Sequence, residues 1–315
     1  MKKVKSIVLI CAGLMTLAAC NNQGLKKTKS GLLYKIISSG KGDLVKKGDF
    51  IKLDFRQKLK DSVLFTSAGG LPAYIRVDSS GPNYTVTEIL PLLRKGDSVV
   101  VIQLADSIQK KSGQPLPPYI KKKDKIILSL KVTDVFPSGE LANLDREKEL
   151  QKQKDIEIKA IEDYIAANKI NVQKSSKGVY VVVDSVGDGP AVDSGKQVSV
   201  FYTGKSFPAG KVFESNVNGP RNEPIKFVVG QHQIIEGWDD GLRLFKKGGK
   251  GTLYIPAYLA YDAQPGPSHK PFENLIFEVR VVDVTDAPKL DPKTMRPMVV
   301  PRGANPQGQP SAPKK

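Results

Sequence analysis

The chain has little of the side-chain chemistry on which most enzymes depend. Its 315 residues include two cysteines, two histidines and one tryptophan. Cys11 lies within an N-terminal apolar run and Cys20 directly follows that run, so the remaining chain has no thiol for a disulfide, a nucleophile or a metal site. His232 and His269 are not spaced as a ligand pair. This composition argues against histidine-ligated metals and Ser-His-Asp triads, and we expect no cofactor.

The N-terminal residues have the pattern of an export signal. Three lysines precede the apolar run of residues 7–19, which is too short to span a bilayer. Residues 17–20, LAAC, resemble the cleavage box of bacterial lipoproteins. That resemblance implies a signal peptide at residues 1–19, lipidation of Cys20 and a tether at residues 20–29. The protein would then be anchored in the bacterial cell envelope, in the outer membrane facing the periplasm. An ordinary secretory signal with an incidental cysteine is the alternative.

The net charge is strongly positive. It is +17 for the whole chain, and removal of residues 1–19, which hold three lysines and no acids, leaves 17 − 3 = +14. In an exported protein this charge favours anionic lipid or envelope phosphates over nucleic acid as a partner. A solvated, lysine-rich surface without a partner is the simpler interpretation, and we favour it.

Residues 198–256 alternate between strand and helix patterns. Apolar residues recur at every second position from Val198 to Tyr202 and again across residues 225–229, as in strands. Before a last strand near residues 253–255, an amphipathic helix is predicted, with acids in its first turn, lysines in its last and a glycine after it. A short helix against an antiparallel sheet predicts an α+β fold with an aromatic pocket. The apolar face of that helix consists of Ile235, Trp238, Leu242 and Phe245.

Three sequence blocks in this region resemble the FKBP-type peptidyl-prolyl isomerase family. They are Y-T-G followed by F-x-S at residues 202–215, I-I-x-G-W-D-x-G at residues 234–241, and L-x-I-P-x-x-L-A-Y at residues 253–261. The resemblance extends from about Gly178 to Val284. The number and the order of the blocks make a chance match improbable.

The resemblance implies that residues 171–287 form an isomerase domain with a proline pocket. Such a site needs no nucleophile, acid or metal, because the barrier of about 18–20 kcal/mol is the loss of amide resonance. By resemblance Trp238 forms the floor, while a backbone N–H near Ile235 and the hydroxyl of Tyr261 hold substrate carbonyls. Core packing is the alternative role for each residue. The expected catalytic residues are Tyr202, Phe213, Glu214, Trp238, Tyr261 and Phe277, and the expected substrate-binding residues are Ile225, Phe227, Ile234, Ile235 and His269.

Several positions depart from the family pattern. Glu214 stands where aspartate is usual, Ile225 where an aromatic residue is common, and Asp262 where glycine is usual. The loop that follows lacks the usual Ile-Pro, so His269 or Pro271 is expected to replace a wall residue. These departures predict activity that is weak or has an altered substrate preference.

Residues 30–137 repeat the pattern of residues 171–287. For example, Val135 ends a run that corresponds to the one ending at Val284, and the predicted offset is 147 to 149 residues over the whole span. We interpret the repeat as two copies of one fold.

The first copy has lost the residues of the site. Phe55 stands where the second copy has Tyr202, Phe65 is matched with Phe213, and the tryptophan position falls near Val86. Substrate capture, spacing from the membrane or dimerisation are the predicted uses of this degenerate copy.

Residues 138–170 are rich in helix formers and predict one long linker helix. Isoleucines at helical spacing indicate that its C-terminal part packs on a domain, with a mostly charged outer face that includes Glu157. A coiled-coil dimer is the alternative, but sustained heptads are absent. The predicted architecture is therefore α+β, with two FKBP-like domains, each an antiparallel sheet wrapped over one short helix, joined by this long helix. Residues 288–315 are rich in proline and predicted to be disordered.

These patterns predict a lipid-anchored prolyl isomerase that assists the folding of exported proteins. Its expected partners are proline-containing or unfolded polypeptides and the membrane, with no nucleic acid. The degenerate first copy supports an alternative, a non-catalytic chaperone or binding module on a lipid anchor. A purely structural envelope lipoprotein is a third hypothesis.

Overall fold

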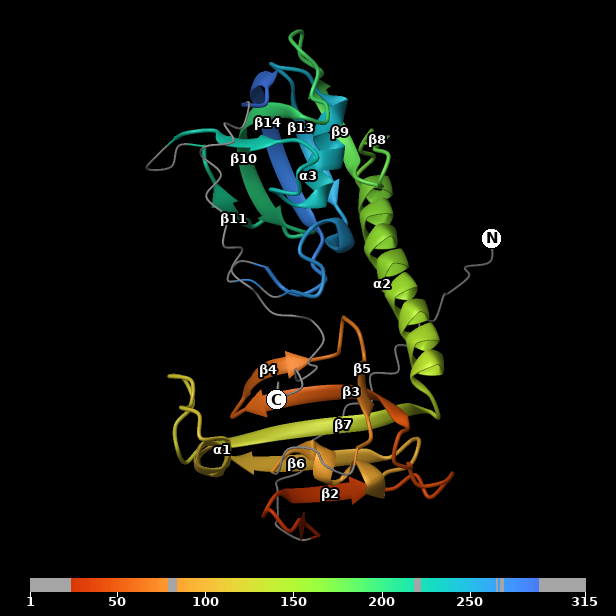
Figure 1. The fold of residues 1–315 in the computed structure, drawn as a ribbon. Coiled ribbons are helices and arrows are strands. Elements are labelled where there is room, and N and C mark those ends of the chain that lie inside the picture. The colour runs from red at the N-terminus through yellow and green to blue at the C-terminus, as the bar shows by residue number, and fades with distance from the viewer. Residues whose placement is uncertain (1–23, 79–83, 218–221, 265, 267–268, 289–315) are drawn as a thin grey trace, which may run out of the picture. The chain divides into compact units, whose positions relative to one another are not determined.

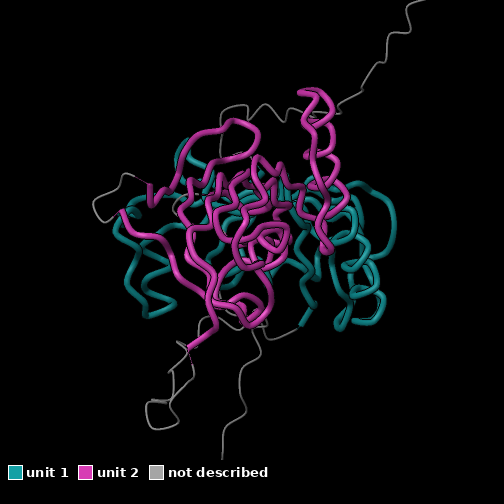
Figure 2. The backbone as a smooth tube through the Cα atoms, turned by 90° about the horizontal axis from the view of Figure 1, so that it is seen from above, with its two compact units in different colours: residues 1–153 teal, residues 154–315 magenta. Residues whose placement is uncertain are grey.

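The computed structural model describes residues 24–78, 84–217, 222–264, 266 and 269–288. The chain divides into two compact units, residues 1–153 (unit 1) and residues 154–315 (unit 2), as Figure 2 shows. The predicted signal peptide, Cys20 and almost all of the proline-rich tail lie outside the described residues. In the part of the chain that is described, no helix is both long and apolar enough to cross a membrane.

Unit 1 is built on a seven-stranded antiparallel sheet in the order β1-β2-β6-β7-β3-β4, with β5 also paired to β3. The long strand β7 lies between β6 and β3 (Figure 1). Two short 3₁₀ turns pack on this sheet, and helix α1 follows β6. The strands are β1 (Lys26–Lys27), β2 (Leu33–Ile37), β3 (Phe50–Leu59), β4 (Ser62–Thr66), β5 (Ala73–Arg76), β6 (Ser98–Leu104) and β7 (Lys125–Phe136); the helical segments are Val86–Glu88, Leu90–Leu92 and α1 (Ala105–Ser112).

Unit 2 repeats this sheet in the order β8-β9-β13-β14-β10-β11, with β12 also paired to β10. The short helix α3 lies against the sheet (Figure 1). The strands are β8 (Gln173–Lys174), β9 (Tyr180–Ser185), β10 (Lys196–Ser206), β11 (Val212–Ser215), β12 (Ile225–Val228), β13 (Lys250–Ile255) and β14 (Leu275–Asp286); the helical segments are α3 (Glu236–Gly241), Leu242–Leu244 and Ala257–Leu259.

Equivalent backbone hydrogen bonds show that the two units are copies of one fold. The N–H of Gly96 donates to the carbonyl of Val132 at 2.9 Å, and the N–H of Gly248 donates to that of Val281 at 2.8 Å. Both glycines have left-handed backbones, with φ of 88° and 90°, which a residue with a Cβ adopts only with strain. The predicted α+β architecture with two similar domains is confirmed.

The predicted offset between the copies is wrong in the middle of the repeat. Ile51 pairs with Ile75 in unit 1, and Val198 pairs with Phe227 in unit 2. The first residues of these pairs are 198 − 51 = 147 positions apart, whereas the second are 227 − 75 = 152 apart. Loops of different length therefore separate equivalent strands.

The predicted match of Phe65 with Phe213 is also wrong. Gln57 pairs with Phe65 in unit 1, whereas Gly204 pairs with Glu214 in unit 2. Phe65 therefore occupies the position of Glu214, and the leucine before it occupies that of Phe213. Because side chains alternate between the faces of a strand, Phe65 points away from the core and is 57% exposed.

The helix predicted through Phe245 is shorter than its periodicity suggests. Helix α3 ends at Gly241, a 3₁₀ turn follows it, and Phe245 already has an extended backbone. Lys246, predicted in the last turn, instead forms an antiparallel bridge with Ala191. The extended pairing with Ala191 decides the backbone conformation of Lys246, because the helix propensity of a residue is weak compared with its tertiary contacts.

The predicted long helix is confirmed as α2 (Gly139–Ala167), but its predicted outer face is partly wrong. Glu157 is 3% exposed. Its carboxylate accepts the N–H of Tyr258 at 2.9 Å, and its carbonyl accepts the side-chain amide of Asn274 at 2.8 Å. The carboxylate is buried because it satisfies a backbone donor that would otherwise lack a partner.

The N-terminal half of α2 also packs on a domain, which the sequence did not predict. The ammonium group of Lys52 on β3 lies 2.7 Å from Asp145 and 3.0 Å from Glu149. The hydroxyl of Tyr74 donates to Asp145 at 2.5 Å. These groups belong to unit 1, so each half of the helix is held by a different core.

We expect Ile161→Ala to destabilise unit 2 by about 2–5 kcal/mol, because its side chain is fully buried among Tyr180, Tyr254 and Ile276. Ile156→Ala on the same helix is the matched control, since Ile156 is 62% exposed and should change stability by less than about 0.5 kcal/mol. Urea unfolding followed by the fluorescence of Trp238, the one tryptophan of the chain, measures both. Equal effects would contradict the packing of α2 on unit 2.

Candidate active site

The pairing of β10 with β14 brings aromatic rings together around a glycine. Tyr202 lies opposite Val279, and Gly204 lies opposite Phe277. A Cβ on Gly204 would be 2.8 Å from Cζ of Phe213 and 2.9 Å from Cε1 of Phe277. These two rings meet edge-to-face at 5.9 Å and 89°. The motif glycine is therefore needed for close approach of the rings.

Trp238 is the centre of this aromatic cluster. It lies in α3, is 1% exposed and contacts three other rings. The centroid distances are 5.0 Å to Tyr202, 5.3 Å to Phe277 and 5.9 Å to Phe227, and the first two pairs are nearly perpendicular. Such geometry contributes about 0.5–1.5 kcal/mol per pair beyond burial, so the rings hold one another in fixed positions.

A half-buried rim surrounds the buried rings. Trp238, Phe227 and Phe277 are less than 5% exposed, whereas the rim residues remain partly open to solvent. Nine of the eleven predicted site residues belong to this apolar cluster. The other two, Glu214 and His269, contact Tyr202 and Tyr261 of the cluster. The rim residues in the same apolar cluster are Tyr202, Phe213, Ile225, Ile234, Ile235 and Tyr261.

Two tyrosine hydroxyls stay protonated in this site. Burial, and then a hydrogen bond to the Glu214 carboxylate, raise the pKa of Tyr202 above its ordinary value near 10. Burial, and then the negative charge of Glu214, also raise the pKa of Tyr261. Glu214 has one methylene more than the usual aspartate, and it still accepts a hydrogen bond from the hydroxyl of Tyr202. Both hydroxyls are hydrogen-bond donors at neutral pH.

The loop after Tyr261 contributes His269 to the rim. The imidazole stacks on the Tyr261 ring, with centroids 4.1 Å apart and planes 9° from parallel. Asp262 has a left-handed backbone with φ of 50°. Glycine adopts this conformation without steric cost, which explains why glycine is usual here in the family pattern. Aspartate is among the few other residues that adopt this conformation readily.

Sequence reasoning missed Asn216, which fixes the strand that carries Tyr202. Its side-chain oxygen accepts the N–H of Tyr202 at 2.6 Å, and its amide donates to the carbonyl of Val200 at 3.1 Å. In unit 1 the hydroxyl of Ser67 accepts the N–H of Phe55 in the same way, at 2.9 Å. A polar residue at the same place in both repeats was the signal that could have identified it.

The site offers aromatic surface and hydroxyl donors rather than metal ligands. Among the described residues, no group of three or more His, Cys, Asp and Glu side chains is placed to hold a metal ion. Within the same residues, Trp238 Nε1 and Asp239 Oδ2 are buried without a hydrogen-bond partner. Unsatisfied polar atoms of this kind are rare in folded proteins and often mark functional sites.

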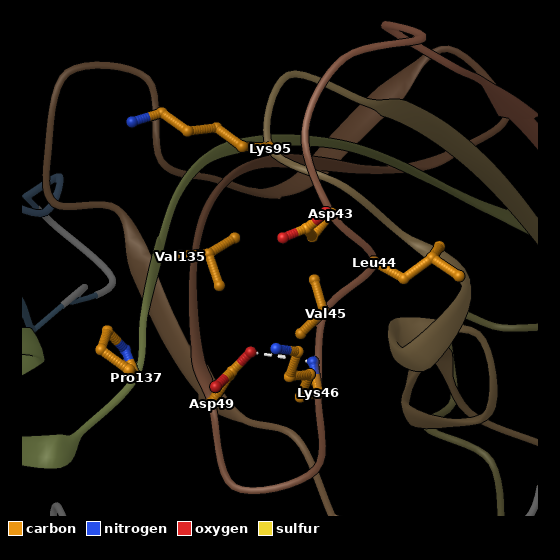
Figure 3. A pocket seen from close by; sticks show the side chains of 8 residues that line it. All are labelled: Asp43, Leu44, Val45, Lys46, Asp49, Lys95, Val135 and Pro137. Atoms are coloured by element: carbon orange, nitrogen blue, oxygen red, sulfur yellow. Dashed lines mark hydrogen bonds between the residues drawn. The ribbon is translucent and has the colours of Figure 1, made fainter.

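The equivalent region of unit 1 lacks this arrangement. Phe55 replaces Tyr202, and Gln57 replaces the glycine that lets the rings meet. A separate cavity of about 290 Å³ lies at the end of the unit 1 sheet where β3 begins (Figure 3). Two of its polar side chains have partners, because Asp49 accepts the N–H of Lys46 at 2.8 Å and Lys95 pairs with Asp134. The cavity is lined by Asp43, Leu44, Val45, Lys46, Asp49, Lys95, Val135 and Pro137.

We expect Gly204→Ala to destabilise unit 2 by about 1–3 kcal/mol, because its methyl group would overlap two rings. The near-ultraviolet circular dichroism of the aromatic cluster should weaken in parallel. Thr203→Ala is the control, since the neighbouring side chain points to the other face of the sheet. A variant with unchanged stability and spectrum would show that the rings do not depend on this glycine.

Comparisons with known proteins find matches to one family. The sequence profile of the FKBP-type peptidyl-prolyl cis-trans isomerase family matches residues 189–282. A probable FKBP-type peptidyl-prolyl cis-trans isomerase of Haemophilus influenzae is 42% identical over 115 residues, which are 36% of this chain and 46% of that protein. An FK506-binding protein of Streptomyces anulatus is 42% identical over 100 residues, which are 31% of this chain and 79% of that protein.

Among solved structures, FkpA from Escherichia coli has 31% identity, covering 47% of this chain and 70% of that chain, with a TM-score of 0.37. The chain spans about half the length of the Haemophilus relative. Its match to the Streptomyces protein covers 79% of that protein. The chain therefore belongs to the FKBP-type peptidyl-prolyl cis-trans isomerase family.

Proposed function

We propose that unit 2 catalyses cis–trans isomerisation of X-Pro peptide bonds. The observation that carries this proposal is the buried Trp238 held edge-to-face by Tyr202 and Phe277 inside a half-buried apolar rim. Proline is apolar on its ring faces and has no N–H, so an aromatic surface binds it without leaving a donor unsatisfied. Unit 1 has no such cluster and is assigned no activity.

Desolvation and twisting of the amide provide the proposed rate enhancement. The planar X-Pro amide has a barrier of about 18–20 kcal/mol, which reflects loss of resonance as the C–N bond rotates. Water stabilises the polar planar state, and an apolar surface that excludes water removes this stabilisation. Each 1.4 kcal/mol gained by the twisted geometry over the planar one accelerates the reaction about tenfold.

Hydrogen bonds from the rim orient the substrate. The hydroxyl of Tyr261 remains protonated and is proposed to donate to a carbonyl of the bound peptide. His269 stacks on the same ring and holds it in place. A backbone N–H near Ile235, where α3 begins, is the second proposed donor. Neither donor transfers a proton, which agrees with a chain that is poor in histidine and cysteine.

The proposed substrates are proline-containing polypeptides that fold after export. The N-terminal signal pattern and the LAAC sequence at residues 17–20 support export. We propose that Cys20 carries lipid and that the protein lies on the periplasmic face of the bacterial outer membrane. The degenerate unit 1 supports a second candidate function, non-catalytic binding of unfolded polypeptides.

Isomerisation of an X-Pro peptide, followed by protease coupling or by NMR exchange, tests the activity. We expect Trp238→Ala to lower kcat/KM at least about tenfold, because it removes the floor of the site. Tyr261→Phe should lower kcat/KM about five- to tenfold through loss of one hydrogen bond of about 1–1.5 kcal/mol. Phe55→Leu, at the position in unit 1 equivalent to Tyr202, is the matched control and should leave the rate unchanged.

Circular dichroism separates loss of activity from loss of fold, and Tyr261→Phe keeps the ring and its packing. A folded wild-type chain with no rate above background would end the enzyme proposal. Suppression of aggregation that survives both Trp238→Ala and Tyr261→Phe would favour the binding function instead.

The lipid anchor makes a separate prediction for the chain expressed in a bacterial host. Intact-mass spectrometry should show a mature chain that begins at Cys20 and carries a diacylglyceryl group and an N-acyl chain. Cys20→Ser should abolish the modification and release the protein from the membrane fraction. An unmodified wild-type cysteine, or cleavage elsewhere, would show an ordinary secretory signal.

A further inference from the structure

The positive charge of the chain is concentrated in unit 1. Residues 24–153 contain 24 Lys and Arg against 14 Asp and Glu, a net charge of 24 − 14 = +10. Residues 154–288 contain 16 against 17, a net charge of 16 − 17 = −1. Because both units have the same fold, the fold itself does not require this charge.

Seven exposed lysines gather at one end of the unit 1 sheet, where β6 ends and β7 begins. Strand pairing places Leu104 opposite Lys125 and Leu59 opposite Ile126, and α1 extends from the same end (Figure 1). The N–H of Asp106 in α1 donates to the carbonyl of Lys122 at 3.0 Å, which holds the neighbouring loop against the helix. We call this surface the basic end; its lysines are Lys60, Lys110, Lys111, Lys121, Lys122, Lys123 and Lys125.

Few acidic groups neutralise the basic end. Asp61, Asp106 and Asp124 lie on the same segments, so the local charge is 7 − 3 = +4. Within the described residues, the one ion pair recorded for these lysines joins Lys60 to Asp124 at 3.2 Å, and the Lys60 side chain is still 63% exposed. The ammonium group of Lys111 lies 5.8 Å from the centroid of the Tyr84 ring, and the seven lysine residues are all exposed to solvent.

The equivalent segment of unit 2 shows what the fold allows at this place. Residues 105–124 join β6 to β7 and carry five lysines and two aspartates, a charge of +3. Residues 256–274 join β13 to β14 and carry one lysine and two acids, a charge of −1. In unit 2 this segment supplies Tyr261 and His269 to the site. In unit 1 the same segment has become a lysine-rich surface.

An exposed aromatic residue lies among these lysines. Tyr119 is 61% exposed and lies two positions before Lys121, in a loop that contains three prolines. Tyrosine has an apolar ring and a polar hydroxyl, and it is enriched with lysine where proteins meet the membrane–water interface.

The short tether limits how far unit 1 can lie from a lipid anchor. Five residues separate Cys20 from Lys26, the first residue of β1, and the chain from Cys20 to Lys26 spans at most about 20 Å when fully extended. A folded domain of this size is wider than that tether. Strand β1 pairs with β2 and runs toward the basic end, because Lys27 lies opposite Leu33 and Leu33 opposite Ile102. The tether therefore enters unit 1 from the side away from the basic end, where Gly24 lies beside Lys35.

We propose that the basic end of unit 1 is a docking surface for an anionic lipid bilayer. Each lysine near such a surface strengthens binding about fivefold at low ionic strength, and the exposed Tyr119 enters the headgroup region. Together with a lipid on Cys20, the basic end would fix which face of unit 1 meets the membrane. This inference does not depend on the isomerase activity of unit 2.

Vesicle binding by the full chain carrying Cys20→Ser, which cannot be lipidated, tests the proposal. We expect it to sediment with vesicles that contain phosphatidylglycerol and not with pure phosphatidylcholine vesicles, and to dissociate at high salt. Replacing four lysines of the basic end by glutamine should weaken binding at least about fiftyfold. That variant combines Lys110→Gln, Lys111→Gln, Lys122→Gln and Lys123→Gln.

A matched control removes the same charge from parts of unit 1 outside the basic end and should weaken binding less than about fivefold. It combines Lys41→Gln, Lys46→Gln, Lys47→Gln and Lys131→Gln, which replace exposed lysines. Equal losses in the two variants, or equal binding to both kinds of vesicle, would overturn the proposal. Tighter binding to a DNA or RNA oligomer than to anionic vesicles at physiological salt would reassign the surface to nucleic acid and also overturn it.

A fluorescence measurement tests the orientation independently of affinity. Tyr119→Trp should shift its emission to shorter wavelength on anionic vesicles, after subtraction of the Trp238 signal of the parent chain. Leu44→Trp, at a 47% exposed position of the opposite end, should show no shift. A shift for Leu44→Trp alone, or for neither variant on vesicles that bind the chain, would contradict docking through the basic end.

Discussion

The site of unit 2 depends on the register of the pairing between β10 and β14. That register puts Tyr202 and Phe277 on the face of the sheet that Trp238 covers. A slip of one residue would send both rings to the opposite face, because side chains alternate along a strand. A bulge between Ser199 and Val200 shifts the register partway along β10, so the alternation beyond the bulge, and with it the site, is set by that irregularity.

Strand alternation and the motif blocks were enough to predict the fold and to select residues that meet in space. Three features could not be predicted, each for a physical reason. The burial of Glu157 depends on a backbone donor at Tyr258, about 100 residues later, which no local pattern reveals. The end of α3 depends on a bridge between Lys246 and Ala191. The place of Phe65 depends on loop lengths, which shift the register without changing the strand pattern.

The two units show how one backbone supports different surfaces. Both retain the same strand order and the same left-handed glycine turns at Gly96 and Gly248. They differ at the site, since unit 1 has Gln57 where Gly204 lets the rings of Phe213 and Phe277 approach each other. They differ again in the segment before the last strand of each sheet, which holds aromatic rim residues in unit 2 and α1 with a lysine-rich loop in unit 1.

The division of α2 between two cores has a consequence for unfolding. An isolated helix of about 12–15 residues is marginal in water, because its first turn fixes several residues for one hydrogen bond. Neither half of this 29-residue helix is much longer than that limit. If either core unfolded, the half of α2 that packs on it would lose its packing contacts and would fray. Once one half of α2 has formed on its own unit, the other half extends an existing helix. The free-energy cost of starting a helix is then met once for both units.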